Sequence, residues 1–243
     1  MITRSSVTSS FGITNKAHTM RPSFQTLTAA TTFYFVRHGE SEANLDGRMQ
    51  GRTESPLTPA GRAQATRTGP FFRGRGITKL LSSPLGRARE TALLIGLGGE
   101  LPEPEIFPDL QELDLGMFSN LRYEDLATLH PREFRAFQAK SWAAVPNAEP
   151  NAELRRRAGR VWAHLIELSQ AGHTEILSVS HGGFLQWIIK ETFGNGSEDW
   201  MPMVEARNCG IFMFEARPVP PAEPGESPSY YGIWRRMNYQ VPE

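Results

Sequence analysis

The hydrophobic positions along the chain follow two spacings that alternate through most of its length. Short continuous apolar runs, rich in aromatic and β-branched residues, predict buried strands. Strands are expected at 33–36, 77–81, 174–179 and 211–214, with weaker candidates at 106–110 and 230–236. Apolar residues three or four positions apart predict helices with one buried face. Helices are expected at 59–72, 87–95, 123–129, 132–139, 152–169 and 184–193.

Strands that alternate with helices predict an α/β fold, here a three-layer α/β/α sandwich with a mainly parallel central sheet. Thr58 and Pro59 support one helix start, because threonine caps helices and proline suits the first turn. A proline-rich segment at 218–228 is expected to be irregular. The folded domain is expected to span 32–243, with 1–31 as an N-terminal extension.

The first thirty residues differ in composition from the rest. They carry Arg4, Lys16 and Arg21, no Asp or Glu, and many Ser and Thr residues. This composition resembles an organelle transit peptide. The alternatives are a disordered tail, or an upstream start codon with the true start at Met20. The first reading would place the protein in an organelle, and the others leave a cytoplasmic location.

Composition narrows the possible partners. The 243 residues have a formal net charge of zero and a hydrophobic fraction of 39%, as in ordinary globular proteins. Nothing in this balance favours binding to nucleic acid or to an anionic membrane. No apolar run reaches the length of a membrane span. Cys209 is the single cysteine, so no intramolecular disulfide can form and a reducing, cytoplasmic compartment is favoured.

Polar clusters follow three of the predicted strands. Arg37 and His38 follow the first, a serine-rich segment leading to Arg87 follows the second, and His181 with Gly182 follows the late one. The carboxyl ends of parallel strands meet at one edge of a sheet, where ligands of α/β proteins bind. Arginine matches phosphate oxygens in a bidentate manner, and glycines at a helix start let backbone amides approach an anion. The clusters therefore predict a phosphate site, where a histidine could also attack phosphorus.

Simpler readings of the same residues exist. Arg37 could pair with Glu40 or Asp114, and Arg87 could be a solvated helix residue. The basic run 155–157 is expected on the exposed face of its helix, with a position near the mouth of the site as the alternative.

Four motifs occur in a fixed order: "RHGE" from Arg37, "SSPLGRARETA" from Ser82, "LQELDLG" from Leu110 and "SVSHGG" from Ser178. Together they resemble the histidine phosphatase superfamily, also called phosphoglycerate mutase-like, across residues 32–214. The resemblance implies the phosphoglycerate mutase-like fold, and it makes 32–243 a catalytic domain that needs no metal and no cofactor.

The resemblance also implies residue roles. His38 corresponds to the nucleophile that becomes phosphohistidine, and Glu112 to the general acid, although Asp109 and Asp114 are neighbouring carboxylates. Two arginines correspond to phosphate clamps and His181 to the second histidine, which would add positive charge if it is protonated. The nucleophile should donate its other ring N–H to the backbone just beyond it. The implied set is His38, Glu112, His181, Arg37 and Arg87 for catalysis, and Arg37, Asn44, Gln50, Gly51, Arg87, His181 and Gly182 for substrate binding.

Within this family the sequence favours a phosphatase. The segment between Glu112 and His181 is short and holds one lysine, Lys140, whereas cofactor-dependent mutases carry an extra helical segment there. "RMQGRTESPLTPAGRAQA" also resembles the phosphatase branch, while the residues at 116–120 depart from its usual Gly-x-Trp-Glu-Gly. We therefore expect a metal-independent phosphomonoesterase of the histidine acid phosphatase type that hydrolyses a small phosphorylated metabolite. The alternatives are a cofactor-dependent phosphoglycerate mutase and a non-catalytic phosphate- or phosphoprotein-binding module; a homodimer is possible.

Overall fold

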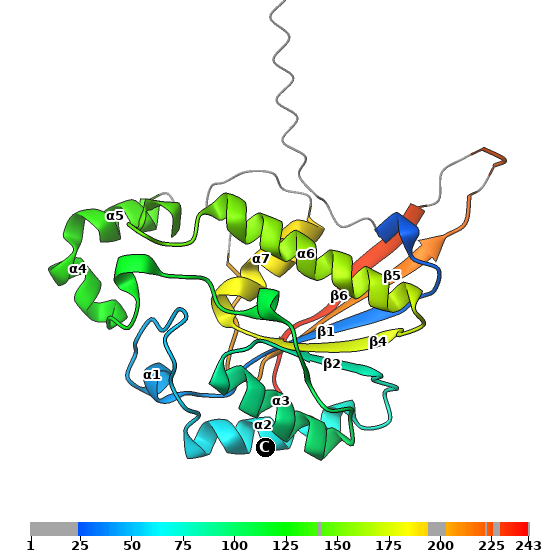
Figure 1. The fold of residues 1–243 in the computed structure, drawn as a ribbon, viewed down its shortest axis with the longest axis horizontal. Helices are drawn as coiled ribbons and strands as arrows, with labels where there is room; N and C mark the ends of the chain where they lie inside the picture. Colours follow the sequence, from blue (N-terminus) through cyan, green and yellow to red (C-terminus); the bar gives the residue numbers. More distant parts are fainter. Residues whose placement is uncertain (1–23, 140–141, 194–202, 222, 226–228, 243) are drawn as a thin grey trace, which may run out of the picture.

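A single six-stranded sheet, ordered β3-β2-β4-β1-β5-β6, runs through the molecule (Figure 1). The computed structural model describes residues 24–139, 142–193, 203–221, 223–225 and 229–242. The strands are β1 (Thr31–Arg37), β2 (Lys79–Ser82), β3 (Glu105–Ile106), β4 (Glu175–Ser180), β5 (Ile211–Val219) and β6 (Ser229–Tyr239). The first four strands in the sheet order pair in parallel, whereas β5 is antiparallel to both β1 and β6. The sheet is therefore mainly parallel, as the sequence predicts.

Helices cover both faces of this sheet (Figure 1). The helices α2 (Pro59–Phe72) and α3 (Gly86–Gly99) lie on one face, and α6 (Asn151–Gln170) and α7 (Gly182–Thr192) lie on the other. The shorter helices are α1 (Glu42–Leu45), α4 (Leu126–Leu129) and α5 (Pro131–Ala139), and single 3-10 turns occur at 24–26, 108–110, 116–118, 123–125 and 142–144. This confirms the three-layer α/β/α arrangement.

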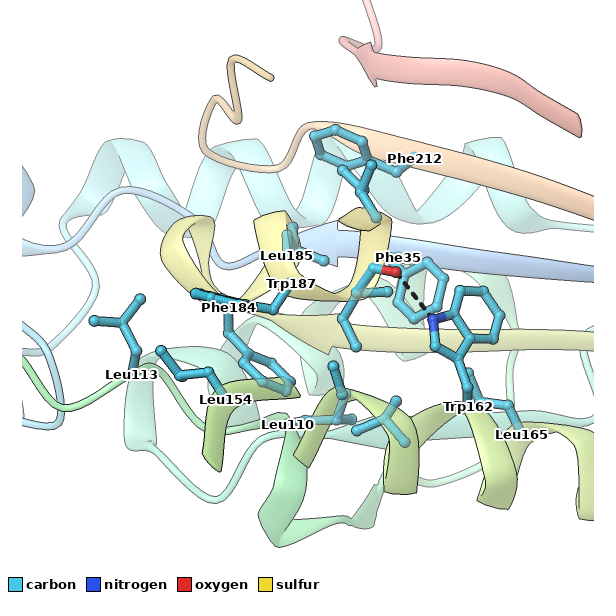
Figure 2. Close-up of a cluster of buried hydrophobic side chains, with 14 of the residues drawn as sticks. Phe35, Leu110, Leu113, Leu154, Trp162, Leu165, Phe184, Leu185, Trp187 and Phe212 are labelled. Carbon is cyan, nitrogen blue, oxygen red and sulfur yellow. Dashed lines mark hydrogen bonds between the residues drawn. The ribbon is translucent and has the colours of Figure 1, made fainter. Parts of the chain in front are cut away.

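The strand β1 is apolar at successive positions because both of its faces are covered. Phe33 and Phe35 point into the core beneath α6 and α7, whereas Tyr34 and Val36 belong to the core beneath α2 and α3. Figure 2 shows the first core, in which the buried Trp162 donates its indole N–H to the carbonyl of Ile188 at 2.9 Å. The side chains of β1 therefore pack alternately into the cores beneath the two helical layers.

Several predicted boundaries shift. Thr58 caps α2 as predicted, because its Oγ1 accepts from the Gly61 amide at 2.9 Å and Pro59 is the first helical residue. The strand expected at 106–110 shrinks to Glu105–Ile106, since Pro108 begins a 3-10 turn. The irregular segment expected from Pro218 is also wrong at its start, because β5 continues to Val219. Proline is tolerated there near the end of the strand pairing.

The folded domain begins before residue 32, where the sequence placed its boundary. Phe24 is 1% exposed, and its ring centroid lies 5.1 Å from that of Trp162 and 4.8 Å from that of Tyr230. The burial of this ring joins residues 24–31 to the core. The transit-peptide prediction falls mainly on residues 1–23, which lie outside the described chain. None of the described helices is long and apolar enough to cross a membrane.

Candidate active site

Three strand ends meet where the sequence predicts the site. Arg37 at the end of β1 lies beside Ser180 of β4 in the parallel register, and Ser82 of β2 lies beside Val179. His38 and His181 each follow their strand directly, so their ring centroids are 5.1 Å apart. Parallel pairing therefore brings the two histidines together across more than 140 residues of sequence.

His38 is a buried, neutral imidazole, and each of its ring nitrogens has a hydrogen-bond partner. The residue is 2% exposed, and its Nδ1 lies 2.7 Å from the Gly39 carbonyl oxygen. Burial, and then the charges of Arg37 and Arg87, lower the pKa of His38 well below its ordinary value. Because Nδ1–H donates to Gly39, the lone pair lies on Nε2, which accepts from Arg87 Nε at 3.3 Å. This contact is the backbone partner that the sequence predicts for His38.

The two arginines bring positive charge that no acidic side chain of the described residues pairs with directly. Arg37 donates to the Ala206 carbonyl at 2.6 Å, and its Nε is buried without a hydrogen-bond partner. Arg87 is also buried and donates to the carbonyls of Thr53 and Gly51 at 2.9 and 2.8 Å. Backbone carbonyls position these guanidinium groups without neutralising them, which suits an anionic ligand.

The simpler pairings considered for these arginines are wrong. Glu40 accepts from the Thr58 hydroxyl at 2.7 Å, and Asp114 accepts from the Gly116 amide at 2.9 Å. Neither carboxylate forms an ion pair with Arg37 in the described part of the chain. The buried Arg87 is likewise not a solvated surface residue.

Glu112 is hydrogen-bonded to the start of α7. Its carboxylate accepts from the amides of Gly183 at 3.1 Å, Phe184 at 2.7 Å and Leu113 at 3.0 Å. Gly183 allows this approach, because a Cβ atom there would lie 2.9 Å from Glu112 Oε1 and 2.7 Å from the Leu113 side chain. The sequence assigned these helix-start amides to a ligand, but two of them bind Glu112 instead. The helix N-terminus thereby fixes the expected acid.

A cavity of about 220 Å³ joins most of the predicted site residues. Its lining includes the following predicted residues: Arg37, His38, Asn44, Gln50, Gly51, Arg87, Glu112 and Gly182. His181 does not line it and is fully buried beside His38. The apolar side chains of the lining include Met49, Leu115, Trp142 and Met203, and Arg48 is a further cation in it. The lining thus combines cations near His38 with apolar side chains.

The predicted binding residues are held by their neighbours. Asn44 Oδ1 accepts from the Ser41 amide at 3.3 Å and from Asn208 Nδ2 at 3.1 Å. The same Asn208 amide donates to the His38 carbonyl at 3.0 Å, so it links Asn44 to His38. With its oxygen occupied, Asn44 has its NH₂ group for a ligand. Gly182 packs against Arg37, since a Cβ atom there would lie 3.3 Å from Arg37 Nε.

His181 is neutral in this ligand-free site, contrary to the expectation that its protonation would add charge. Burial lowers the pKa of His181 well below its ordinary value, and the charges of Arg87 and Arg37 act in the same direction. The positive charge of the site therefore comes from the arginines. Among the described residues, no group of three or more His, Cys, Asp or Glu side chains is placed to hold a metal ion.

Arg157 is a site-supporting residue that sequence reasoning placed on the surface. Its side chain is 2% exposed, whereas that of Arg156 is 64% exposed. Arg157 pairs with the buried Glu149 at 2.8 Å, donates to the Gln111 carbonyl beside Glu112, and stacks 3.8 Å above the Phe184 ring. Arg157 therefore links the segment around Glu112 to α7. The Glu112 carboxylate links the same two parts of the chain.

A signal for this burial was present in the helix spacing. Arg157 lies three residues after Leu154 and four before Val161, both of which are buried on the inner face of α6. Charge alone had suggested exposure, but periodicity places this residue inward. A buried arginine requires a partner, and Glu149 supplies it.

Two arginines, a buried histidine at a strand end and a carboxylate fixed at a helix start lie together at one edge of an α/β sandwich. The family model described as histidine phosphatase superfamily (branch 1) matches residues 33–219. The chain therefore belongs to the histidine phosphatase superfamily, and its fold is phosphoglycerate mutase-like.

Relatives within this family carry different names. The chain is 34% identical over 183 residues to the "Probable phosphoglycerate mutase GpmB" of Citrobacter koseri, covering 73% of this chain and 81% of that protein. It is similar to the alpha-ribazole phosphatase structure from Shigella flexneri, with a TM-score of 0.66 at 25% identity over 86% and 96% of the two chains. The phosphoserine phosphatase from Entamoeba histolytica shares the fold, with a TM-score of 0.65 at 24% identity over 86% and 96%.

Proposed function

We propose that this protein is a metal-independent phosphomonoesterase that acts through a phosphohistidine at His38. The observation that carries the proposal is that His38, with Nδ1 hydrogen-bonded to the Gly39 carbonyl and Nε2 accepting from Arg87, lines one cavity with Arg37 and Arg87. Neither guanidinium has an acidic partner among the described residues. A phosphoryl group is an anion that a nitrogen nucleophile can attack, so it suits both features.

In the first step Nε2 of His38 attacks phosphorus and the bond to the leaving alcohol oxygen breaks. Arg37 and Arg87 neutralise the charge on the phosphoryl oxygens, and Glu112 gives its proton to the alcohol oxygen. In the second step the Glu112 carboxylate takes a proton from water, whose oxygen attacks phosphorus. The N–P bond breaks, inorganic phosphate leaves, and both side chains return to their starting forms.

The apolar residues that line the cavity would contact the alcohol part of the substrate. Met49, Leu115, Trp142 and Met203 offer apolar surface, and the volume of about 220 Å³ suits a small molecule. A compact phosphomonoester with an uncharged or partly apolar alcohol fits this lining. Arg48 could accept one further anionic group, although it also contacts Asp46 at 3.5 Å.

A phosphoglycerate mutase activity is the second candidate, because the curated relative from Citrobacter koseri carries that name. A mutase would return the phosphoryl group from His38 to a second hydroxyl, and it would need a bisphosphorylated primer. The short segment between Glu112 and His181 favours hydrolysis instead.

The test is phosphate release by the purified protein across a panel of phosphomonoesters in EDTA, with and without 2,3-bisphosphoglycerate. We expect release that persists in EDTA, and trapping of a phosphoprotein that His38→Ala abolishes. The variant should lower turnover by more than the roughly hundred- to thousandfold typical of losing one charge-stabilising group. Phosphoglycerate isomerisation that depends on the primer would identify a mutase. Binding without either reaction would overturn both proposals.

A further inference from the structure

The two ring nitrogens of His181 have different surroundings. Nε2 lies 2.7 Å from the Ser83 hydroxyl oxygen, which is buried at the end of β2. Nδ1 is also buried and has no hydrogen-bond partner among the described residues. An unpaired buried polar atom is unfavourable, so its partner is expected to be a ligand. The ring centroid lies 5.1 Å from that of His38, which lines the cavity together with Arg37 and Arg87.

The hydrogen in the bond between Ser83 and His181 can be located from the other contact of Ser83. Its Oγ accepts from the Leu85 amide at 3.3 Å, which uses one lone pair. In the described chain, His181 Nε2 is the remaining polar neighbour of this oxygen. The serine hydrogen therefore has His181 Nε2 as its acceptor. If Nε2 accepts, the proton of the neutral imidazole is on Nδ1.

We propose that Ser83 is a positioning residue that holds neutral His181 in the Nδ1–H tautomer, so that the site presents an N–H donor to a phosphoryl oxygen. Naming a phosphoryl group as the ligand rests on the proposed function. The opposite tautomer would turn the Nδ1 lone pair toward an anionic oxygen, which repels it. Arg37, Arg87 and Asn44 would then hold the phosphoryl group without the donor on His181.

One hydrogen bond sets the tautomer of each histidine, but the two rings then present different groups to the ligand: a lone pair in His38 and an N–H in His181. His38 donates from Nδ1 to the Gly39 carbonyl, which leaves the Nε2 lone pair for attack on phosphorus. His181 accepts at Nε2 from Ser83, which leaves Nδ1–H for binding. Each ring carries its proton on Nδ1, but the fixed partner is at Nδ1 in one case and at Nε2 in the other.

The primary test is nitrogen NMR of the full-length protein labelled with ¹⁵N-histidine, in which long-range proton correlations report the tautomer of each ring. His181→Ala assigns the signals. We expect a protonated Nδ1 and an unprotonated, hydrogen-bonded Nε2 in His181 of the ligand-free protein. A proton on Nε2 would overturn the proposal. This readout does not depend on turnover, so a protein with the expected tautomer and no phosphate release would refute only the proposed function.

Variants of the two adjacent serines provide the second test. Ser83→Ala should give His181 a mixture of tautomers and, in an active enzyme, lower kcat/KM by roughly ten- to hundredfold, the range seen when partners that orient metal-bound histidines are lost. Ser83→Thr keeps the hydroxyl and should retain the Nδ1–H tautomer. Ser82→Ala is the matched control, because it removes a buried hydroxyl that donates to the Ser83 carbonyl at 3.0 Å. An unchanged tautomer in Ser83→Ala would overturn the role of Ser83, and if that variant does not fold, the wild-type spectrum decides.

Discussion

At the scale of the residue, the site combines side chains whose reactive atoms are set by backbone contacts. Glu112 accepts from three amides, while His38 donates to the Gly39 carbonyl. Backbone groups of a packed sheet and helix move little, so they hold these atoms in place before a substrate arrives. Such preorganisation is the main source of electrostatic catalysis in many enzymes.

Replacement of Glu112 should separate substrates by their leaving groups. Glu112→Ala removes the proposed proton donor, so kcat/KM for an alkyl phosphate should fall by roughly a hundred- to ten-thousandfold. The loss on p-nitrophenyl phosphate should be much smaller, because that leaving group needs little protonation. Asp109→Asn is the control, since this nearby carboxylate pairs with Arg160 and does not line the cavity. Equal losses on both substrates would remove Glu112 from the acid role.

At the scale of the element, α6 supports the site through one inward arginine. Arg157 contacts the backbone beside Glu112, the carboxylate of Glu149 and the ring of Phe184. Arg52 also binds Glu149, at 2.9 Å, so one buried carboxylate joins two cations. The network connects α6, α7 and the loop that carries the expected acid.

Two neighbouring arginines of α6 should differ sharply in their effect on stability. Arg157→Ala leaves Glu149 buried with a weakened set of partners, and should lower the free energy of unfolding by about 3–5 kcal/mol. Arg156→Ala removes a solvent-exposed ion pair with Glu153, and should change the free energy of unfolding by less than about 0.5 kcal/mol. Urea unfolding followed by tryptophan fluorescence measures both. Similar values for the two variants would contradict the network.

At the scale of the whole molecule, the two buried histidines link folding to pH. Burial is the largest cause that lowers the pKa of each, and for both His38 and His181 the charges of Arg37 and Arg87 also lower it. The unfolded chain binds protons at these positions near pH 6.5, while the folded protein does not. The stability they contribute is thus present above about pH 6.5 and is lost as the pH falls toward their folded-state pKa values.

The pH dependence of stability should therefore weaken when either histidine is replaced. Below pH 6.5, the free energy of unfolding should fall by up to about 1.4 kcal/mol per pH unit for each histidine. Urea unfolding at pH 7.5 and 5.5 should show a smaller loss in His38→Ala and in His181→Ala than in the wild type. In the double variant, the pH-dependent loss of unfolding free energy should be reduced by the sum of the two single-variant reductions. The carboxylates contribute equally in the wild type and in the three variants, so they do not affect this comparison. Identical pH profiles would contradict neutral burial.

Much of this protein follows from its sequence, because strand and helix periodicity are local properties. The apolar run of β1, the cap at Thr58 and the order of the four motifs together predict the sandwich and place Arg37, His38, Arg87 and His181 at one edge. The segment 105–110 was harder to predict, because a short apolar run beside a proline fits a strand or a turn.

The tertiary structure alone decided how distant residues set each other's chemistry. Glu112 binds the Gly183 amide across 71 positions, and Ser83 meets His181 across 98, so no local pattern could reveal either contact. The contact of Arg157 with the Gln111 carbonyl, 46 positions away, needed the same information, although the helix spacing already indicates that Arg157 faces inward. The sequence therefore determined which groups reach the site, and long-range packing decided their protonation, direction and support.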